Sequence, residues 1–148
     1  MPPGPPKKRK PLESGFKERA YCGNPLACAA ALAVLDRFGD PSVLAHARQL
    51  GEQLRQRLEA WAEQFPVIGQ ARGLGPMRAI EWVSDRNSKT PDKAAALAVV
   101  RYAYEHGVIL MACGTHGNVL RFLVPLTLTY EQLDEGLAVI EDGLRQLG

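Results

Sequence analysis

The stretch VIGQARGLGPMRAIEWV, residues 67–83, predicts the centre of the fold. Val67-Ile68 and Met77–Val83 are short runs rich in apolar and β-branched residues, which favour strands. Gly73-Leu74-Gly75 lies between them and favours a turn, because glycine adopts backbone conformations that other residues avoid. The three segments predict two strands of one sheet. Charged residues within the second run break strict alternation and leave the register open.

A second pair of strands is predicted further along the chain. Val108–Met111 and Val119–Leu123 are both short and apolar, and the glycine-containing loop Gly114–Gly117 joins them. Neither segment is long enough for a typical helix, and both are bounded by residues that favour turns. The sequence therefore predicts three or four short strands.

Helices are predicted on both sides of these strand pairs. Asn24-Pro25 begins a first helix, since Asn caps helices and Pro suits the first turn. Its sequence LACAAALAVLDRF (26–38) is apolar almost all round, which predicts a helix buried on several sides. Asp40-Pro41 begins a second helix, amphipathic to about Gln64. Thr90-Pro91 begins a third, which extends to Tyr104.

The last helix carries a capping signal. Thr129 precedes it and Gln132 follows three residues later, which is the spacing of a capping box. Leucine and isoleucine then recur every three or four residues up to the C-terminus. Together the elements predict an α+β fold with two layers, in which a short, mostly antiparallel sheet is backed by helices.

Composition narrows the classes of function. The chain has 148 residues, 46% hydrophobic and 23% charged, which suits one globular domain. The net charge is only +2, and Lys7–Lys10 form a single basic block, so the remainder shows no nucleic-acid signature. Three dispersed cysteines predict free thiols, with neither disulfides nor a metal site. No apolar run approaches the ~18 residues of a membrane span, so we expect no membrane partner.

Residues 1–19 differ from residues 20–148. The N-terminal segment is rich in Pro, Gly and Lys and has few large apolar residues, so we expect a disordered tail followed by one domain. Residues 6–10 resemble a short nuclear-import signal, and a vector-encoded or mistranslated leader is the alternative interpretation. For the folded part we expect a cytoplasmic location, or the mitochondrial matrix if the source is eukaryotic.

Arg121 is the candidate functional residue that the sequence singles out. It interrupts the apolar strand Val119–Leu123, where a buried arginine is costly without an anion beside it. One interpretation is a structural ion pair with a carboxylate such as Glu81. Another is a ligand carboxylate held by the planar guanidinium in two parallel hydrogen bonds. A third is that the side chain faces water.

Two segments resemble class III aminotransferases of the 4-aminobutyrate type, which depend on pyridoxal phosphate (PLP). YCGNPLACAAA (21–31) is similar to the start of the helix that links the large and small domains in that family. NVLRFLVPL (118–126) is similar to the strand that carries its substrate-binding arginine. Arg72–Met77 and Gly107–Leu110 fall where that family has strands. The resemblance covers residues 21–148.

The resemblance implies that this chain is the C-terminal small domain of a fold-type I enzyme. Such an enzyme transfers an amino group from 4-aminobutyrate or a related ω-amino acid to 2-oxoglutarate. Arg121 would bind a substrate carboxylate. The partners implied are the large domain of the parent enzyme and a second subunit of a homodimer.

The chain departs from the family pattern at the cofactor site. Ala20 stands where the family has a threonine that binds the cofactor phosphate, and alanine has no hydroxyl to donate. No lysine matches the catalytic lysine, which PLP chemistry requires. We therefore expect no catalytic residue, no bound PLP and no activity in this chain alone. A stand-alone module that binds a carboxylate ligand or a protein partner is the alternative hypothesis.

Overall fold

Residues 24–147 are described by a computed structural model and divide into two compact units. The first unit ends at Asp40 and the second begins at Pro41. The predicted tail of residues 1–19, and Ala20 with it, lie outside the described residues.

The first unit contains helix α1, Pro25–Phe38. Asn24 caps it as predicted, because its side-chain oxygen accepts a hydrogen bond from the amide of Leu26 at 3.0 Å. The expectation that this helix is buried differs from the structure, in which none of its residues is buried. Among the described residues α1 is the only helix or strand of its unit, so no other element of that unit covers its apolar side chains.

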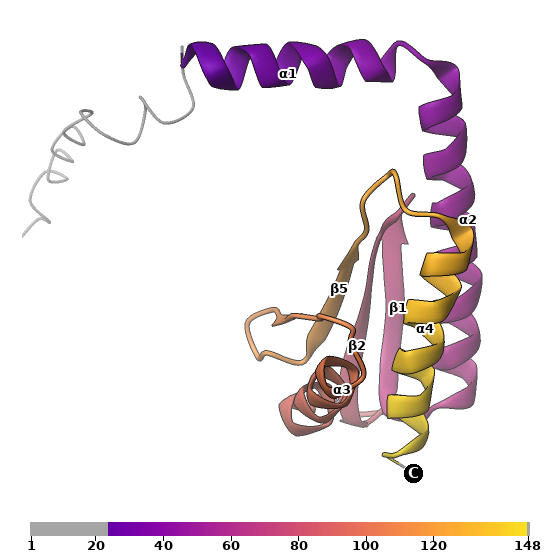
Figure 1. The fold of residues 1–148 in the computed structure, drawn as a ribbon. Helices are drawn as coiled ribbons and strands as arrows, with labels where there is room; N and C mark the ends of the chain where they lie inside the picture. The colour runs from indigo at the N-terminus through magenta and orange to yellow at the C-terminus, as the bar shows by residue number, and fades with distance from the viewer. Residues whose placement is uncertain (1–23, 148) are drawn as a thin grey trace, which may run out of the picture. The chain divides into compact units, whose positions relative to one another are not determined.

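The second unit is an antiparallel sheet backed by three helices, which confirms the predicted α+β architecture (Figure 1). The strands are hydrogen-bonded in the order β1-β2-β5-β4, and β3 pairs with the far end of β2. All of their pairings are antiparallel. The strands are β1 Ile68–Leu74, β2 Met77–Asp85, β3 Thr90–Pro91, β4 Ala112–Cys113 and β5 Val119–Leu123.

The hairpin of β1 and β2 is longer than the sequence predicted. Ile68 begins β1, which continues through Gly73 to Leu74, so the turn contains only Gly75 and Pro76. Gly75 has φ +52°, a conformation that favours glycine. The predicted turn at residues 73–75 is therefore displaced toward Pro76.

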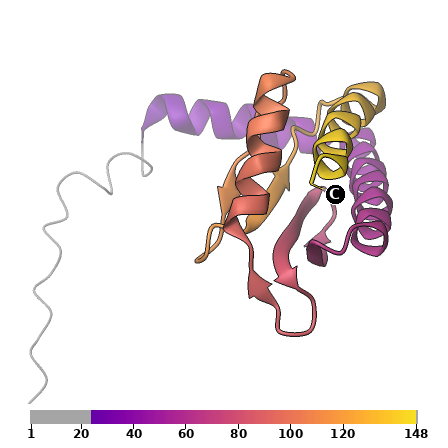
Figure 2. The ribbon, with the colours of Figure 1, turned by 90° about the horizontal axis from the view of Figure 1, so that it is seen from below.

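The three helices of this unit cover one face of the sheet (Figures 1 and 2). They are α2 Pro41–Gln64, α3 Lys93–Glu105 and α4 Tyr130–Arg145. Successive strand residues point to opposite faces, and Ile80 and Trp82 of β2 and Leu120 and Phe122 of β5 face the helices. Leucines along α2 and α4 complete this core. Burying these side chains is the main source of stability in such a domain.

Two element boundaries differ from the prediction. Thr90-Pro91 pairs with β2 instead of starting α3, and the side chain of Asp92 caps that helix through the amide of Ala95 at 2.9 Å. Val108–Met111 is not a strand, and ladder pairing begins only at Ala112. The capping box of Thr129 and Gln132 is confirmed. No helix within residues 24–147 is long and apolar enough to cross a membrane.

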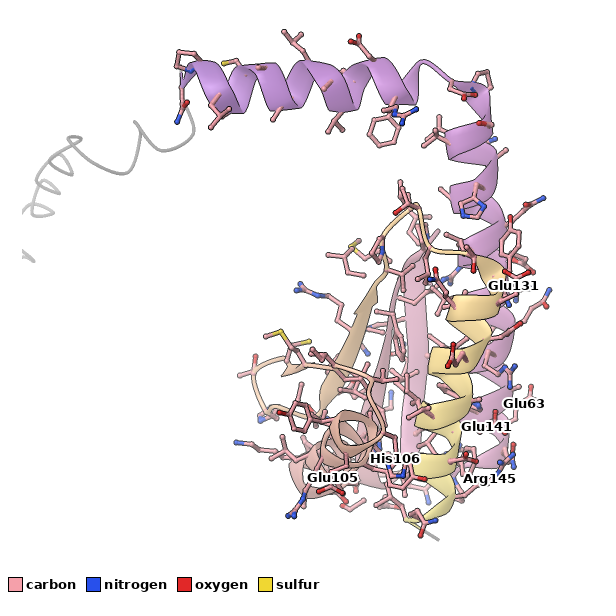
Figure 3. All side chains as sticks on the ribbon, in the orientation of Figure 1. Glu63, Glu105, His106, Glu131, Glu141 and Arg145 are labelled. Atoms are coloured by element: carbon pink, nitrogen blue, oxygen red, sulfur yellow. The ribbon has the colours of Figure 1, made fainter. Side chains whose placement is uncertain are left out.

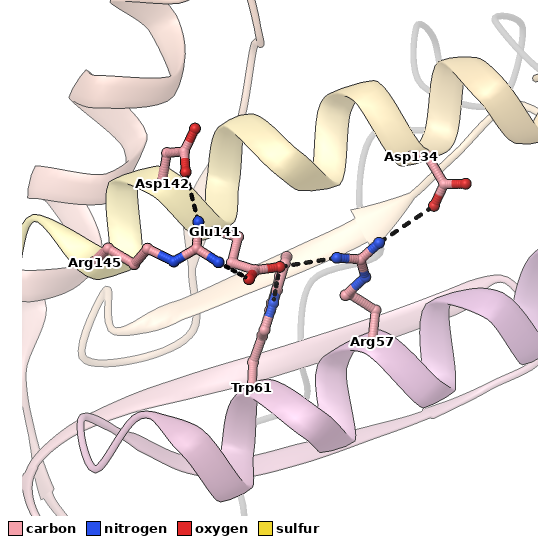
Figure 4. Close-up of polar contacts among 6 residues, drawn as sticks. All are labelled: Arg57, Trp61, Asp134, Glu141, Asp142 and Arg145. Atoms are coloured by element: carbon pink, nitrogen blue, oxygen red, sulfur yellow. Dashed lines mark hydrogen bonds and ion pairs between the residues drawn. The ribbon is translucent and has the colours of Figure 1, made fainter.

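A polar network joins α2 to α4 beside the core. Glu141 and Arg145 lie near the C-terminal end of α4 (Figure 3). Glu141 Oε2 accepts hydrogen bonds from Trp61 Nε1 at 3.0 Å and from Arg57 Nη1 at 2.9 Å (Figure 4). Arg145 Nη2 lies 2.5 Å from Glu141 Oε1. The indole hydrogen bond is the largest cause of the lowered pKa of Glu141.

Candidate functional site

The face of the sheet turned away from α2, α3 and α4 is the candidate site. Side chains there form rows across the strands, because the antiparallel register places residues opposite one another. Arg72, Ala79 and Arg121 form the central row. A second row is apolar and exposed: Leu74 (81%), Met77 (52%) and Leu123 (65%). We call the surface formed by these two rows and the outward-facing strand residues beside them the open sheet face.

Arg121 lies on the open sheet face and its side chain is exposed. It is opposite Ala79, which has the smallest side chain in the neighbouring part of β2. On the other side is a groove of about 380 Å³, lined by residues 109–113 and 121–125. Arg121 is the one charged residue in this lining, and the groove is otherwise mainly apolar.

The structure does not pair Arg121 with Glu81. Within residues 24–147, no carboxylate forms an ion pair with Arg121. The register explains this, because Glu81 is opposite Val119 and Arg121 is opposite Ala79. The interpretation of Arg121 as a buried structural ion pair is therefore wrong.

Glu81 instead contacts two residues that the sequence did not single out. Its Oε2 lies 2.7 Å from Arg72 Nη1, and its Oε1 lies 3.4 Å from Asn118 Nδ2. The hydrogen bond from Arg72 is the main cause that lowers the pKa of Glu81. Both oxygens of Glu81 thus have hydrogen-bond partners, whereas Arg121 on the adjacent strand pairs with no carboxylate within residues 24–147.

Asn118 is buried, with 1% of its surface exposed. Its side-chain Nδ2 donates to the backbone carbonyl of Trp82 at 2.8 Å. The backbone carbonyl of Asn118 accepts a hydrogen bond from the backbone amide of Trp82 at 2.7 Å. A buried amide with satisfied hydrogen bonds fixes backbone position. Asn118 therefore sets the register in which β5 meets β2, three residues before Arg121. The available signal in the sequence was a polar residue directly before an apolar strand.

Comparisons with known proteins give the chain its family. The family model of class-III aminotransferases matches residues 7–144. A probable 4-aminobutyrate aminotransferase of Bacillus subtilis is 42% identical over 125 residues, which cover 84% of this chain and 29% of that protein. A 5-aminovalerate aminotransferase of Pseudomonas putida is 48% identical over 122 residues, covering 82% of this chain and 28% of that protein.

Solved structures agree with this assignment. A phospholyase from Arthrobacter, in complex with phosphoethanolamine, superposes with a TM-score of 0.76 at 34% identity, covering 85% of this chain and 30% of the other. An aminotransferase from Bacillus anthracis gives a TM-score of 0.76 at 27% identity, covering 84% of this chain and 29% of the other. The chain spans less than a third of the length of these proteins. It belongs to the class III aminotransferase family, whose enzymes use PLP.

Proposed function

We propose that this chain is the C-terminal domain of an aminotransferase that moves an amino group from 4-aminobutyrate, or a related ω-amino acid, to 2-oxoglutarate with the help of PLP. Support comes from relatives named 4-aminobutyrate and 5-aminovalerate aminotransferase at 42–48% identity. Other relatives are named isoleucine 2-epimerase and ethanolamine-phosphate phospho-lyase, at 38% and 34% identity. Because one domain type occurs with several reactions, the reaction is inferred from the higher identities.

Arg121 binds the carboxylate of the substrate in this proposal. The observation that carries it is the exposed guanidinium of Arg121, which has no carboxylate partner within residues 24–147 and borders the apolar groove of residues 109–113 and 121–125. A planar guanidinium forms two parallel hydrogen bonds with a carboxylate. The apolar groove walls suit the methylene groups of an ω-amino acid or a five-carbon oxo acid.

The described residues do not fit PLP. They include two lysines, Lys89 and Lys93, and both are exposed, so neither is desolvated as a reactive amine requires. When bound, PLP supplies the electron sink for amino transfer. In this proposal another domain holds PLP, and this chain contributes Arg121 to substrate binding. The chain alone is then inactive and binds no PLP.

The partners in this proposal are the large domain of the parent enzyme and a second subunit of a homodimer. Two exposed apolar surfaces support a need for protein partners. Helix α1 has no buried residue although its sequence is apolar almost all round, as in helices enclosed by protein. The open sheet face exposes Leu74, Met77 and Leu123.

A pair of experiments tests the proposal. In the intact parent enzyme, Arg121→Ala should lower kcat/KM for 2-oxoglutarate by about a hundredfold or more, because a charge-assisted contact is lost. Arg101→Ala, at an exposed arginine on α3, is the matched control and should change little. An unchanged kcat/KM in Arg121→Ala would remove Arg121 from the substrate site.

The chain alone supplies the second experiment. It is incubated with PLP, reduced with borohydride and examined by mass spectrometry for a phosphopyridoxyl lysine. We expect no specific adduct. Stoichiometric labelling of one lysine would show that the chain holds the cofactor by itself.

A further inference from the structure

Glu81 and Arg121 are neighbours that do not pair. Both lie on the open sheet face, on adjacent strands, and Glu81 is opposite the residue two positions before Arg121. Diagonal neighbours of this kind are about 7–8 Å apart at their backbones, which long side chains can bridge. Glu81 is therefore a potential competitor for the guanidinium that a ligand carboxylate would use.

Two contacts occupy Glu81. Arg72 Nη1 lies 2.7 Å from Oε2 of Glu81, and this arginine is itself steadied by Gln70 Oε1 at 3.0 Å. Oε1 of Glu81 faces Asn118 Nδ2 at 3.4 Å. Asn118 is buried and fixed by Trp82, so it holds that side of the carboxylate in place. Both oxygens of Glu81 thus have hydrogen-bond partners other than Arg121.

We propose that Arg72 is a positioning residue that sequesters Glu81, with Asn118 as its fixed counterpart, and so keeps Arg121 free for the substrate carboxylate. The inference rests on the proposed carboxylate-binding role of Arg121. Removing Arg72 releases Glu81, which then pairs with Arg121 and competes with the ligand. Removing Glu81 in addition eliminates the competitor.

The test uses this chain and 2-oxoglutarate as the probe. Binding is followed through the Arg121 Nε–H resonance in ¹H–¹⁵N spectra during titration. Arg72→Met should weaken binding about fivefold, the size expected from a cross-strand charge pair. The double variant Arg72→Met/Glu81→Gln should return to within about twofold of the wild type. Arg101→Met removes a paired arginine from α3 and controls for net charge.

The single variant Glu81→Gln distinguishes sequestration of Glu81 by Arg72 from a long-range electrostatic effect of the two charges on ligand binding. If Glu81 is already held by Arg72, its neutralisation changes affinity by less than about twofold. If Arg72 and Glu81 act only through their charges, Glu81→Gln strengthens binding as much as Arg72→Met weakens it. That additive result would overturn the proposal, as would a double variant that stays weak.

The remaining outcomes are equally decisive. If Arg72→Met does not fold, Glu81→Gln alone still discriminates, because a severalfold gain in affinity contradicts sequestration and an unchanged affinity supports it. If the wild-type Arg121 resonance does not respond to 2-oxoglutarate at all, the carboxylate role of Arg121 and this inference both fail. A normal wild-type response with unchanged Arg72→Met affinity refutes only the inference.

Discussion

Replacing Glu141 should destabilise the second unit by an amount that depends on the new side chain. Glu141 has 14% of its side chain exposed and accepts the indole N–H of Trp61, which is 1% exposed. Leucine at position 141 would leave that buried N–H without an acceptor and remove the contact with Arg57. We expect a loss of about 2–4 kcal/mol in the free energy of unfolding.

Glutamine keeps an acceptor for Trp61 and loses only the charge. Hydrogen bonds to charged groups are stronger than neutral ones by roughly 1 kcal/mol, so Glu141→Gln should cost about that much. Asp142→Asn is the matched control, because Asp142 also pairs with Arg145 but is 55% exposed. It should change stability by less than about 0.5 kcal/mol.

The cost of Glu141→Gln should also depend on pH. The pKa of folded Glu141 is lowered, mainly by the hydrogen bond from Trp61, so the unfolded chain takes up the proton first as the pH falls. The charged form therefore contributes its full stabilisation above about pH 5, and this contribution is lost as the pH falls through the folded-state pKa. The difference in free energy of unfolding between wild type and Glu141→Gln should therefore become smaller as the pH falls.

Urea melts at pH 7 and at about pH 3 measure each of these quantities. If Glu141→Leu and Asp142→Asn lower the free energy of unfolding by the same amount, the role assigned to the indole hydrogen bond is refuted. If the difference in free energy of unfolding between wild type and Glu141→Gln is the same at both pH values, the role assigned to the charge is refuted.

Other predictions concern the backbone, Arg121 and the N-terminus. A Cβ at Gly51 would lie 2.4 Å from the carbonyl carbon of Gly75, so Gly51→Ala should destabilise by about 1–3 kcal/mol in urea melts. Gly136→Ala on α4, where nothing lies within 4 Å, should instead stabilise by about 0.4–1 kcal/mol, and a loss there would contradict the reasoning. Arg121→Ala should cost less than about 0.5 kcal/mol in this chain, and a loss of several kcal/mol would mean that the side chain is locked in the fold. Residues 1–19 should show low ¹⁵N order parameters; rigid-backbone values would refute the predicted tail.

Features set by local chemistry were predictable from the sequence. Asn24 caps α1 and Thr129 with Gln132 caps α4, because a cap depends on side chains within three residues of the amides they satisfy. The first strand pair was also found, since apolar runs on either side of a glycine-containing turn favour a hairpin. Of the second pair only Val119–Leu123 was placed correctly, because strand pairing begins at Ala112 and not within residues 108–111. The antiparallel α+β architecture follows from these elements.

Features set by contacts between distant segments were not predictable. Thr90 and Asp92 are both competent helix caps, and the pairing of Thr90-Pro91 with β2 decides in favour of Asp92. The role of Glu81 depended on a register that its sequence neighbours do not reveal. Once Gly75-Pro76 is known to be the turn, counting along the hairpin places Gln70 opposite Glu81, with Arg72 as its diagonal neighbour.

Side chains along β2 and β5 alternate between the two faces of the sheet, so the residues that stabilise the fold are different from those available for binding. Residues 80, 82, 120 and 122 hold the fold, whereas Ala79, Arg121 and Leu123 project from the other surface. Substitutions in the second set leave the packed layer intact, so binding preference can drift under selection without passing through unfolded intermediates. A protein engineer can use the same freedom: a library confined to the outward positions would vary ligand choice on a constant framework.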